Sequence, residues 1–427
     1  MHMKVILLYK YERQMIELSK TVIGFIGCGG MAEAHCHGLR DLWDAGQKNF
    51  EVAAVCDIEI KRAEKMADGF AAFTNRRPVV YSDAADMLAK EKSLDTVLVI
   101  TPHISHHTLS IMAMEAGVNV MVEKPIALTV RLAKRMIETA RVTGKLLHVA
   151  EQYRLSLDQR AVNWAIRTGI IGVPRVLHWM DVGERKWYWN WRDHIDISGG
   201  AWTFDGGVHH SDLFQYNLGP VKRVSAASRT FDNIRYQKYE SLDDYEKARL
   251  EQRYAHFRQT RSLKPVDPGT LEEPISATVE DTTAAVLEFE SGVIGTWLVS
   301  RATPGKTDRT NAIYGSEAAI FWNDGVYNSR QEQIYTAESL KEAFLHGISP
   351  EDKEYFLPFG VQNTLSIQWQ QHFDALAGVR PVEVTAEVGL AAMLVPMAIY
   401  ESSEIGQSVL ISDVMDLKVE AYQKRLM

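Results

Sequence analysis

A glycine-rich turn near the start of the chain has the residue types needed to hold a phosphate group. The apolar run Thr21–Ile26 predicts a strand, and Gly27-Cys28-Gly29-Gly30-Met31-Ala32 follows it directly. Glycine at Gly27 permits a tight turn, Gly29 lets the backbone approach a pyrophosphate, and the small Ala32 lets the next helix pack closely on the strand. The amides at the start of that helix would point at the phosphates. The spacing is that of a dinucleotide-binding turn.

An aspartate ends the next predicted strand, where the adenosine ribose of a dinucleotide would lie. The strand is Glu51–Asp57, and Asp57 lies further past Gly29 than the usual spacing of about 20 residues. A carboxylate here accepts hydrogen bonds from the ribose hydroxyls and repels a 2′-phosphate, which favours NAD over NADP. Lys61 and Arg62 follow closely enough to reach a phosphate. Helix N-capping is the alternative role for Asp57.

Three further segments carry polar residues at defined spacings. Two predicted strands end in Thr101-Pro102-His103-Ile104-Ser105-His106 and in Glu123-Lys124-Pro125. Later, the glycine-rich segment Ser198–Ala201 leads to Asp205-x-x-x-His209-x-x-Asp212. Open parallel sheets bind ligands outside the carboxyl ends of their strands. We therefore expect the first two segments to approach the same ligand as the glycine turn.

The histidines of these segments raise the question of a metal site. One group lies within 103–107, and the other is His209, His210 and Asp212. A metal needs ligands that converge on one point, whereas on a helix His210 would point away from His209. We expect no metal site, and we expect His35 to pack inside its own helix.

The composition indicates an ordinary globular protein. The chain has 427 residues, 46% hydrophobic and 24% charged, which suggests two or three domains. With a net charge of −8, the chain lacks the excess positive charge that attracts nucleic acid or an anionic membrane. Three cysteines cannot form a disulfide scaffold, so we expect a cytoplasmic location. Residues 1–20 contain only a short apolar run, Val5–Tyr9, and are expected to be an extension.

Strands and helices alternate through the first part of the chain, which predicts βαβ units and a parallel sheet. The predicted helices and strands after the glycine turn cover 31–43, 51–57, 94–100, 105–116, 118–122, 129–143 and 146–150. We assign 21–150 to a nucleotide-binding domain and 151–427 to a second α/β domain.

Taken in order, these motifs resemble those of the glucose–fructose oxidoreductase/inositol dehydrogenase family. The similarity runs from about Val22 to Val409, and Ala201 stands where the family usually has a third glycine. The resemblance implies a Rossmann domain, a C-terminal α/β domain with a largely antiparallel open sheet that commonly mediates oligomerisation, and NAD(P)-dependent oxidoreduction of sugars or cyclitols. It also implies a cis peptide bond before Pro125.

The resemblance implies that Lys124, Asp205 and His209 form the catalytic group, and these residue types suit the chemistry. Oxidation of a secondary alcohol needs a base for the hydroxyl proton, and imidazole titrates near neutrality. An ammonium beside the same oxygen stabilises the developing alkoxide. We expect His209 to accept the proton, Lys124 to polarise the hydroxyl, and Asp205 to bind substrate and orient the imidazole. Asp205 is equally suited to cap the helix that follows.

The remaining site residues follow from these assignments. The segment Trp187–Asp193 has three tryptophans, whose faces stack on sugar rings, and Arg192, a planar fork of donors. A buried structural cluster is the alternative, and the short distance in sequence to Asp205 favours a pocket wall. The expected substrate contacts are Lys124, Trp191, Arg192, Asp205 and His209. The expected cofactor contacts are Gly27, Cys28, Gly29, Gly30, Met31, Asp57, Thr101, Pro102, His106, Glu123, Lys124 and Gln152.

The second domain is expected to contain successive antiparallel strands, one face of which another subunit would cover. Its predicted strands are 174–182, 279–289, 293–303 and 310–314, and its predicted helices are 157–169, 367–377 and 387–401, the last two amphipathic. An insertion is predicted at about 232–276, with a helix start at Ser241–Asp244. It is either a solvent-exposed helical segment or a lid or subunit arm that alters access to the substrate.

Three functions compete at this stage. The first is a net NAD-dependent dehydrogenase of a sugar, glycoside or cyclitol, assembled as a dimer or tetramer. The second is a redox-neutral glycosidase or epimerase that forms a transient keto-sugar with a tightly held NAD. The third is a non-catalytic nucleotide-binding sensor, against which the presence of Lys124, Asp205 and His209 argues, because a sensor needs no acid–base group.

Overall fold

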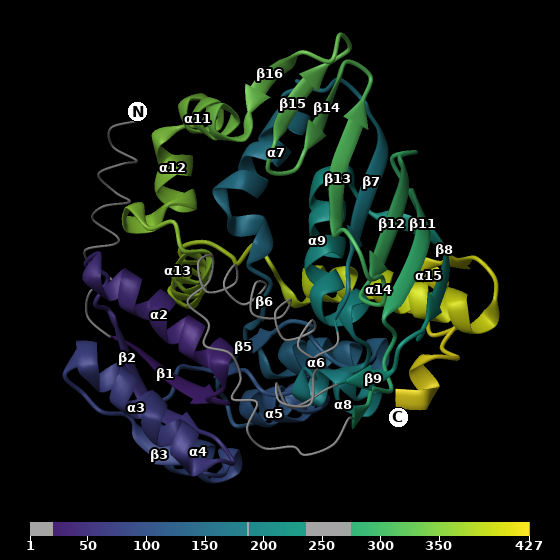
Figure 1. Cartoon of the computed structure of the whole chain (residues 1–427). Helices are drawn as coiled ribbons and strands as arrows, with labels where there is room; N and C mark the ends of the chain where they lie inside the picture. Colours follow the sequence, from purple (N-terminus) through teal and green to yellow (C-terminus); the bar gives the residue numbers. More distant parts are fainter. Residues whose placement is uncertain (1–19, 186–187, 236–274, 427) are drawn as a thin grey trace, which may run out of the picture.

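Six strands in the first part of the chain form a parallel sheet in the order β3-β2-β1-β4-β5-β6 (Figure 1). The structure, a computed structural model, describes residues 20–185, 188–235 and 275–426. The strand order is that of the Rossmann fold, so the predicted fold of this part is confirmed. The strands are almost continuously apolar because helices cover both faces of the sheet. Their bounds are β1 Thr21–Ile26, β2 Phe50–Cys56, β3 Val79–Tyr81, β4 Thr96–Val99, β5 Asn119–Glu123 and β6 Leu147–Ala150.

The helices of this part connect the strands. Side chains cap the start of some of these helices, and a glycine caps the end of one. The Asp83 and Thr129 side chains accept hydrogen bonds from the first-turn amides of α4 and α6, and Gly144 ends α6 with a positive φ. The sequence predicts no helix or strand within 58–93, and this stretch forms α3, β3 and α4. The helices are α2 Gly30–Asp44, α3 Ile60–Thr74, α4 Ala84–Lys90, α5 His103–Glu115 and α6 Val130–Thr143.

The second part of the chain is built on a nine-stranded, mostly antiparallel sheet in the order β16-β15-β14-β13-β7-β12-β11-β8-β17. The strands are β7 Pro174–Val182, β8 Val221–Arg229, β11 Thr282–Phe289, β12 Ile294–Ser300, β13 Asp308–Gly315, β14 Ala318–Phe321, β15 Gly325–Asn328, β16 Gln333–Thr336 and β17 Val409–Leu410.

One predicted pairing in this sheet is wrong. The sequence suggested that β12 and β13 are antiparallel neighbours because a short turn joins them. In the structure β7 lies between them, parallel to β12 and antiparallel to β13. The short connection between β12 and β13 therefore joins two strands that lie on either side of a third. The order of the strands in the sheet depends on the long-range pairing of β7 with both.

The longest described helix, α14 (Ala386–Ile405), is a core helix. By length and composition it is the one helix among the described residues that could cross a membrane, but most of it is buried inside the fold. It packs against β8, α6 and α9 (Gly207–Leu218), and α9 and α14 lie on one face of the nine-stranded sheet (Figure 1). The expectation of an amphipathic helix is wrong for the middle of α14, because residues 390–399 are all apolar and nearly all buried, as in a core helix.

A late helix of the chain returns to the first sheet. Helix α13 (Thr364–Leu376) packs on α2, and Trp369 and Phe373 belong to the same hydrophobic core as Phe25 and Phe50. The parallel sheet is therefore completed by residues far beyond position 150. The remaining helices are α7 Leu157–Arg167, α8 Ile195–Ser198, α11 Ala337–Gly347, α12 Pro350–Phe356 and α15 Ile411–Met415.

Two segments with predictions lie outside the described residues. These are the N-terminal extension up to residue 19 and positions 236–274 of the insertion, including its predicted helix start at 241–244. The two ends of the insertion are adjacent, because β9 (Ile234–Arg235) pairs antiparallel with β10 (Ile275–Ser276).

Candidate active site

The glycine turn between β1 and α2 has the geometry of a phosphate cradle. Gly27 has φ +104°, and a Cβ there would lie 2.3 Å from the carbonyl oxygen of Ile100, so only glycine fits. A Cβ on Gly29 or Gly30 would meet no atom of the described residues within 4 Å. Helix α2 begins at Gly30, and no side chain of the described residues caps its first amides. Open space and unpartnered amides therefore lie where an anion binds.

Asp57 is tied to this turn rather than to a helix. Its Oδ2 accepts a hydrogen bond from the Cys28 amide and its Oδ1 accepts one from the Glu59 amide, both at 2.8 Å. Helix α3 begins three residues later, with Glu59 in the N-cap position. The N-cap alternative for Asp57 is wrong, and the carboxylate lies at the carboxyl end of β2, beside the glycine turn.

Lys124 follows β5 in a segment that buried groups hold in place. The Lys124–Pro125 peptide bond is cis, as the resemblance implied. The Glu123 carboxylate lies 2.9 Å from His35 Nε2 and accepts a hydrogen bond from the Lys124 amide. Thus His35, expected only to pack in its helix, is a partner of Glu123. The Lys124 Nζ donates to the Asp205 carbonyl oxygen at 2.7 Å and to Asp205 Oδ1 at 3.1 Å. An ammonium has three N–H groups, so one is left for a ligand.

Asp205 is a buried carboxylate surrounded by donors. Besides Lys124, His103 Nε2 lies 3.1 Å from its Oδ1, and Arg192 Nε donates to its Oδ2 at 3.1 Å. Burial alone would raise the pKa of Asp205, but the charges of Lys124 and Arg192 hold the pKa well below its usual range. Asp205 lies in a π-helical turn, Trp202–Gly206, and the N-cap residue of α9 is Gly206. The N-cap alternative for Asp205 is therefore wrong as well.

His209, in the first turn of α9, contacts a different carboxylate from the expected one. Its Nδ1 lies 2.6 Å and 2.7 Å from the two oxygens of Glu151, and the Tyr153 ring stacks on the imidazole, with centroids 3.8 Å apart. Burial, and next the charge of Lys124, lowers the pKa of His209 to about 3. The π-helical turn between Asp205 and α9 breaks the α-helical i, i+4 geometry. The prediction that Asp205 orients His209 is thus wrong.

Glu151 is a candidate site residue that sequence reasoning missed. It follows β6 directly, in the position that drew attention to Asp57 and Lys124 after their strands, so the same rule would have found it. Next to it, Gln152 has a buried amide oxygen without a hydrogen-bond partner among the described residues. That orphaned acceptor lies at the edge of the sheet where a cofactor is expected.

Among the residues after β4, His106 differs from the expectation. His106 is fully buried, with Nδ1 2.8 Å from the Pro125 carbonyl oxygen and Nε2 2.9 Å from that of Thr101. Both ring nitrogens face backbone, so no polar atom of His106 is left for a cofactor, and the ring instead ties two strand ends together. Pro102 precedes the first turn of α5. His103 lies between Asp205 and the Ser198 carbonyl oxygen.

Metal ligands do not converge on any point of the described residues. Across 20–185, 188–235 and 275–426, no group of three His, Cys, Asp or Glu side chains has the geometry to hold a metal ion. Ala201 stands where the family usually has a third glycine, and its φ of −89° lies outside the left-handed range that favours glycine.

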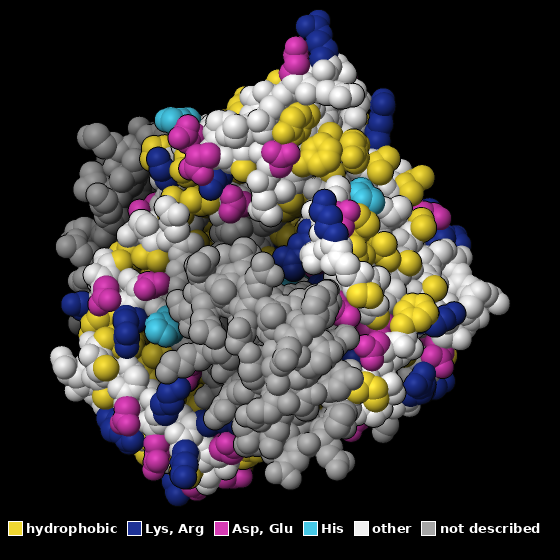
Figure 2. All heavy atoms as spheres, in the orientation of Figure 1, with side chains coloured by type: hydrophobic (Ala, Val, Ile, Leu, Met, Phe, Trp, Pro, Cys, Tyr) yellow, Lys and Arg dark blue, Asp and Glu magenta, His cyan; other side chains and the backbone are white. Residues whose placement is uncertain are grey.

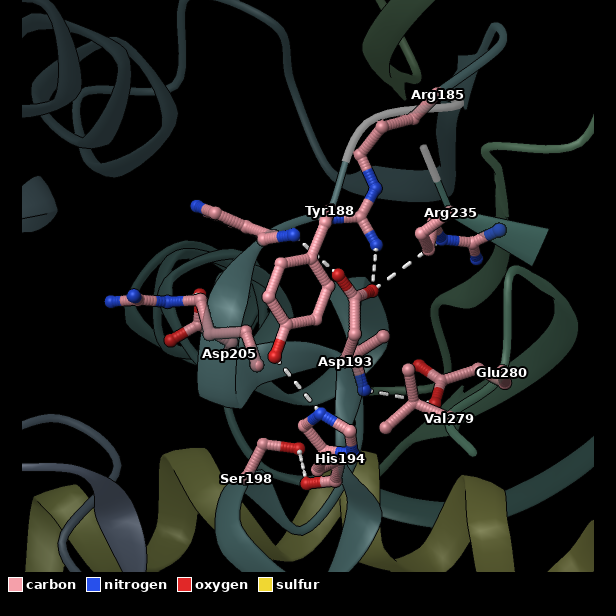
Figure 3. Close-up of polar contacts among 12 residues, drawn as sticks. Arg185, Tyr188, Asp193, His194, Ser198, Asp205, Arg235, Val279 and Glu280 are labelled. Carbon is pink, nitrogen blue, oxygen red and sulfur yellow. Dashed lines mark hydrogen bonds and ion pairs between the residues drawn. The ribbon is translucent and has the colours of Figure 1, made fainter. Parts of the chain in front are cut away.

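The aromatic segment before the site holds Arg192. The Arg192 guanidinium lies 4.3 Å from the Trp191 ring centroid and 5.0 Å from that of Trp189, and Trp191 packs edge-on against His103. Trp187 lies outside the described residues. Asp193, the last residue of this segment, forms ion pairs with Arg185 and Arg235 (Figure 3). The indoles thus act at least in part by aiming Arg192 at Asp205.

The strand order, the glycine turn and Asp57 together define the class of protein, a Rossmann-fold protein that binds a dinucleotide. The chain belongs to the Gfo/Idh/MocA oxidoreductase family. The family's NAD-binding Rossmann domain matches residues 21–151, and its C-terminal domain matches residues 159–321.

Relatives of known name support this assignment. The chain is 32% identical over 222 residues to D-apiose dehydrogenase of Paraburkholderia graminis, covering 50% of this chain and 56% of the relative. It is 30% identical over 223 residues to D-glucoside 3-dehydrogenase of Escherichia coli, covering 51% and 59%. A glycosyl hydrolase family 109 protein of Shewanella baltica is 26% identical over 213 residues, covering 48% and 44%. The chain thus spans about half the length of these relatives.

Solved structures share the fold over most of the chain. An oxidoreductase domain protein from Kribbella flavida has a TM-score of 0.70 at 22% identity, covering 92% of this chain and 100% of its own. Levoglucosan dehydrogenase in complex with NADH has a TM-score of 0.67 at 20% identity, covering 92% and 99%. At this identity the likeness shows the fold alone.

Proposed function

We propose that the protein is an NAD-dependent dehydrogenase that oxidises a secondary hydroxyl of a sugar, glycoside or cyclitol. The observation that carries the proposal is the placement of an ammonium and an imidazole at the carboxyl ends of two neighbouring strands, because Lys124 follows β5 and His209 contacts Glu151, which follows β6. Lys124 bonds Asp205, and the charge of the same Lys124 acts on the buried imidazole of His209. An ammonium and an imidazole at the carboxyl edge of a Rossmann sheet are the groups that alcohol oxidation requires.

The residues present fit a nicotinamide dinucleotide. The pyrophosphate has open space above Gly29 and Gly30 and the uncapped start of α2, and Gln152 offers an unpartnered amide oxygen. Asp57 lies beside the glycine turn at the carboxyl end of β2, where its carboxylate would accept hydrogen bonds from the ribose hydroxyls and would repel a 2′-phosphate, which favours NAD over NADP. When bound, the cofactor accepts the hydride from the substrate carbon.

Each residue of the site has a distinct task in this reaction. Asp205 and Arg192 neutralise one another and fix Lys124, whose remaining N–H donates to the substrate oxygen and stabilises the alkoxide. His209, which burial keeps neutral, takes the hydroxyl proton. The Trp191 ring and the outer nitrogens of Arg192 supply a wall suited to a carbohydrate, in keeping with relatives named for apiose and glucosides.

A substrate panel tests the proposal. Purified protein is incubated with NAD and sugars, glycosides and cyclitols, NADH absorbance is followed, and mass spectrometry identifies any copurified cofactor. NADH accumulating with a keto-sugar supports the dehydrogenase. Turnover of a glycoside without added NAD would instead support a redox-neutral reaction, which the family 109 relative's name makes worth testing. Failure of NAD to bind would overturn both.

We also propose that a second copy of the chain covers the open face of the nine-stranded sheet. Val176, Ile294 and Tyr314 lie side by side in register across β12, β7 and β13, and their exposed fractions are 42%, 55% and 39%. Figure 2 shows hydrophobic side chains over the strands of this sheet. A contiguous exposed apolar face is typical of a subunit interface.

A further inference from the structure

We propose that Glu151 is the positioning residue that orients His209 and holds the ring proton on Nδ1, so that Nε2 is the atom that receives the substrate proton. The inference rests on the proposed function, in which His209 is the base. Glu151 thus orients the His209 imidazole, a role that the sequence pattern predicted for Asp205.

Two contacts fix the imidazole. Both carboxylate oxygens of Glu151 lie within 2.7 Å of His209 Nδ1, and the Tyr153 ring lies over the imidazole at an interplanar angle of 2°. Glu151 is itself held, because its Oε1 accepts a hydrogen bond from the Tyr153 amide at 3.1 Å. Glu151 and His209 are both buried. The carboxylate therefore cannot turn away, and the imidazole cannot tilt out of the stack.

Asp205 is committed elsewhere. Its two carboxylate oxygens are shared by Lys124, His103 and Arg192, and no described contact joins it to the His209 ring. The π-helical turn places Asp205 toward the end of β5, whereas α9 presents His209 to the end of β6. The Asp205 carboxylate thus binds the Lys124 ammonium, and the Glu151 carboxylate binds the His209 imidazole.

The chemistry follows from the donors and acceptors. An ionised carboxylate only accepts hydrogen bonds, so a neutral imidazole beside Glu151 must carry its proton on Nδ1 and leave the lone pair on Nε2. When the substrate O–H bond breaks, its proton forms the Nε2–H bond, and the resulting imidazolium is stabilised by the adjacent carboxylate. The arrangement has the logic of the buried aspartate and histidine of serine proteases.

The pair also predicts a pH limit. Burial raises the pKa of Glu151 to about 7, and the groups facing the pair are Lys124, Arg154, Glu123, Asp205 and Asp212. Uptake of one proton by the pair either places a proton on Nε2 or removes the carboxylate charge that stabilises the imidazolium. The rate of oxidation should therefore fall as the pH drops below about 7.

The variant Glu151→Gln gives a test that needs no substrate. The amide of Tyr153 must still find an acceptor, so the Gln oxygen stays there and its NH₂ faces Nδ1, which must then accept. The ring proton moves to Nε2. We would record nitrogen-15 NMR of ring-labelled histidines above pH 7.5, with His209→Asn to assign the His209 signals. We expect Nδ1–H in the wild type and Nε2–H in Glu151→Gln.

A matched control separates orientation from simple loss of packing. Asp212 lies on the same helix as His209 and forms a buried ion pair with Arg154. Asp212→Asn weakens this ion pair and removes no contact of the imidazole, so it should destabilise the protein but leave Nδ1–H in place. With a substrate in hand, Glu151→Gln should lower kcat by about 10²-fold or more with little change in KM, and Glu151→Asp, which keeps the charge, should be intermediate.

The outcomes are distinct. An Nε2–H tautomer in the wild type, or an unchanged tautomer in Glu151→Gln, overturns the inference whatever the activity. The proposed function fails separately, when wild-type protein neither binds NAD nor reduces it with any substrate of the panel.

Discussion

Single residues of the site divide into two buried clusters that meet at Lys124. Lys124 and Arg192 compensate the charge of Asp205, and Glu151 faces His209. The Lys124 charge also lowers the pKa of His209, second only to burial. The lysine therefore has two effects, since it stabilises negative charge on the substrate oxygen and keeps the nearby imidazole unprotonated until the reaction delivers a proton.

Replacing Lys124 by methionine removes the ammonium and keeps most of the side-chain length. In Lys124→Met we expect kcat to fall by about 10²–10³-fold because the alkoxide loses a charged donor. NAD should still bind, since the glycine turn and Asp57 are unchanged. Steady-state kinetics and a fluorescence titration with NAD measure the two quantities. Lys90→Met, at an exposed lysine, is the control, and wild-type kcat in Lys124→Met would contradict the assignment.

At the scale of elements, the β1–α2 turn contains two glycines with different physical roles. Gly27 is required by the fold, because its φ is +104° and a Cβ would press on the Ile100 carbonyl oxygen. Gly29 has φ −80°, which any residue adopts, and lies against open space. Its requirement for glycine comes from the ligand rather than from the protein.

The variants Gly27→Ala and Gly29→Ala should therefore separate stability from binding. Gly27→Ala should cost roughly 1–3 kcal/mol or more of folding free energy through backbone strain. Gly29→Ala should fold with an unchanged Tm but bind NAD at least about tenfold more weakly, because the added methyl group occupies space needed by the pyrophosphate. Denaturation curves and NAD titrations check both. Equal effects of the two variants on Tm would refute the distinction.

The contact of α13 with the first sheet contains a buried histidine pair. His372 of α13 lies with Nδ1 3.1 Å from Nδ1 of His148 in β6, and its Nε2 lies 2.8 Å from Thr96 Oγ1. Burial lowers the pKa of His372 to about 3 and that of His148 well below its usual value. Both rings are thus neutral in the folded protein over a pH range in which the unfolded chain takes up protons.

This difference makes the folding free energy depend on pH. The contribution of His372 is fully present above about pH 6.5, the unfolded value, and is lost as the pH falls toward about 3. The contribution of His148 has the same sign. At pH 5.5 the loss from His372 is about 1.4 kcal/mol. His372→Gln should reduce the decline in stability between pH 7.5 and 5.5 by about that amount in urea denaturation. His37→Gln, at an exposed histidine, is the control, and an unchanged decline in His372→Gln would disprove the account.

At the scale of the whole molecule, two sheets share one chain in an interleaved way. The parallel sheet is completed by α13, and α14 supports the nine-stranded sheet while touching α6 and β6 of the first part. The carboxyl ends of β5 and β6 therefore face α9 across a junction packed from both sides. Precise placement of Lys124 against His209 depends on that junction, since the two residues come from different halves of the chain.

The open face of the nine-stranded sheet leads to a prediction about assembly. Ile294→Glu places a charge in the middle of the apolar row, so we expect the oligomer to dissociate while each subunit stays folded and binds NAD. Light scattering after size-exclusion chromatography measures the mass. Val142→Glu, at an exposed apolar residue of α6, should leave the assembly intact. A wild-type protein that is monomeric at micromolar concentration would rule out this interface.

The sequence by itself determined the features that depend on short stretches of chain. The glycine turn, Asp57 after β2 and Lys124 after β5 were found because a strand, its end and the following turn are encoded within about ten residues. The cis bond before Pro125 followed from the resemblance to the family. Even Glu151 carried this local signal, at the end of β6.

The tertiary structure alone decided which of these residues are partners. The position of β7 between β12 and β13, the docking of α13 and the bond between Glu151 and His209 all join segments distant in sequence. The π-helical turn that contains Asp205 precedes α9, and its Asp205 contacts Lys124 at the end of β5. Hydrogen bonds and packing depend on distances in space, and a periodic pattern along the chain fixes a residue's place on its own element but not what lies opposite it.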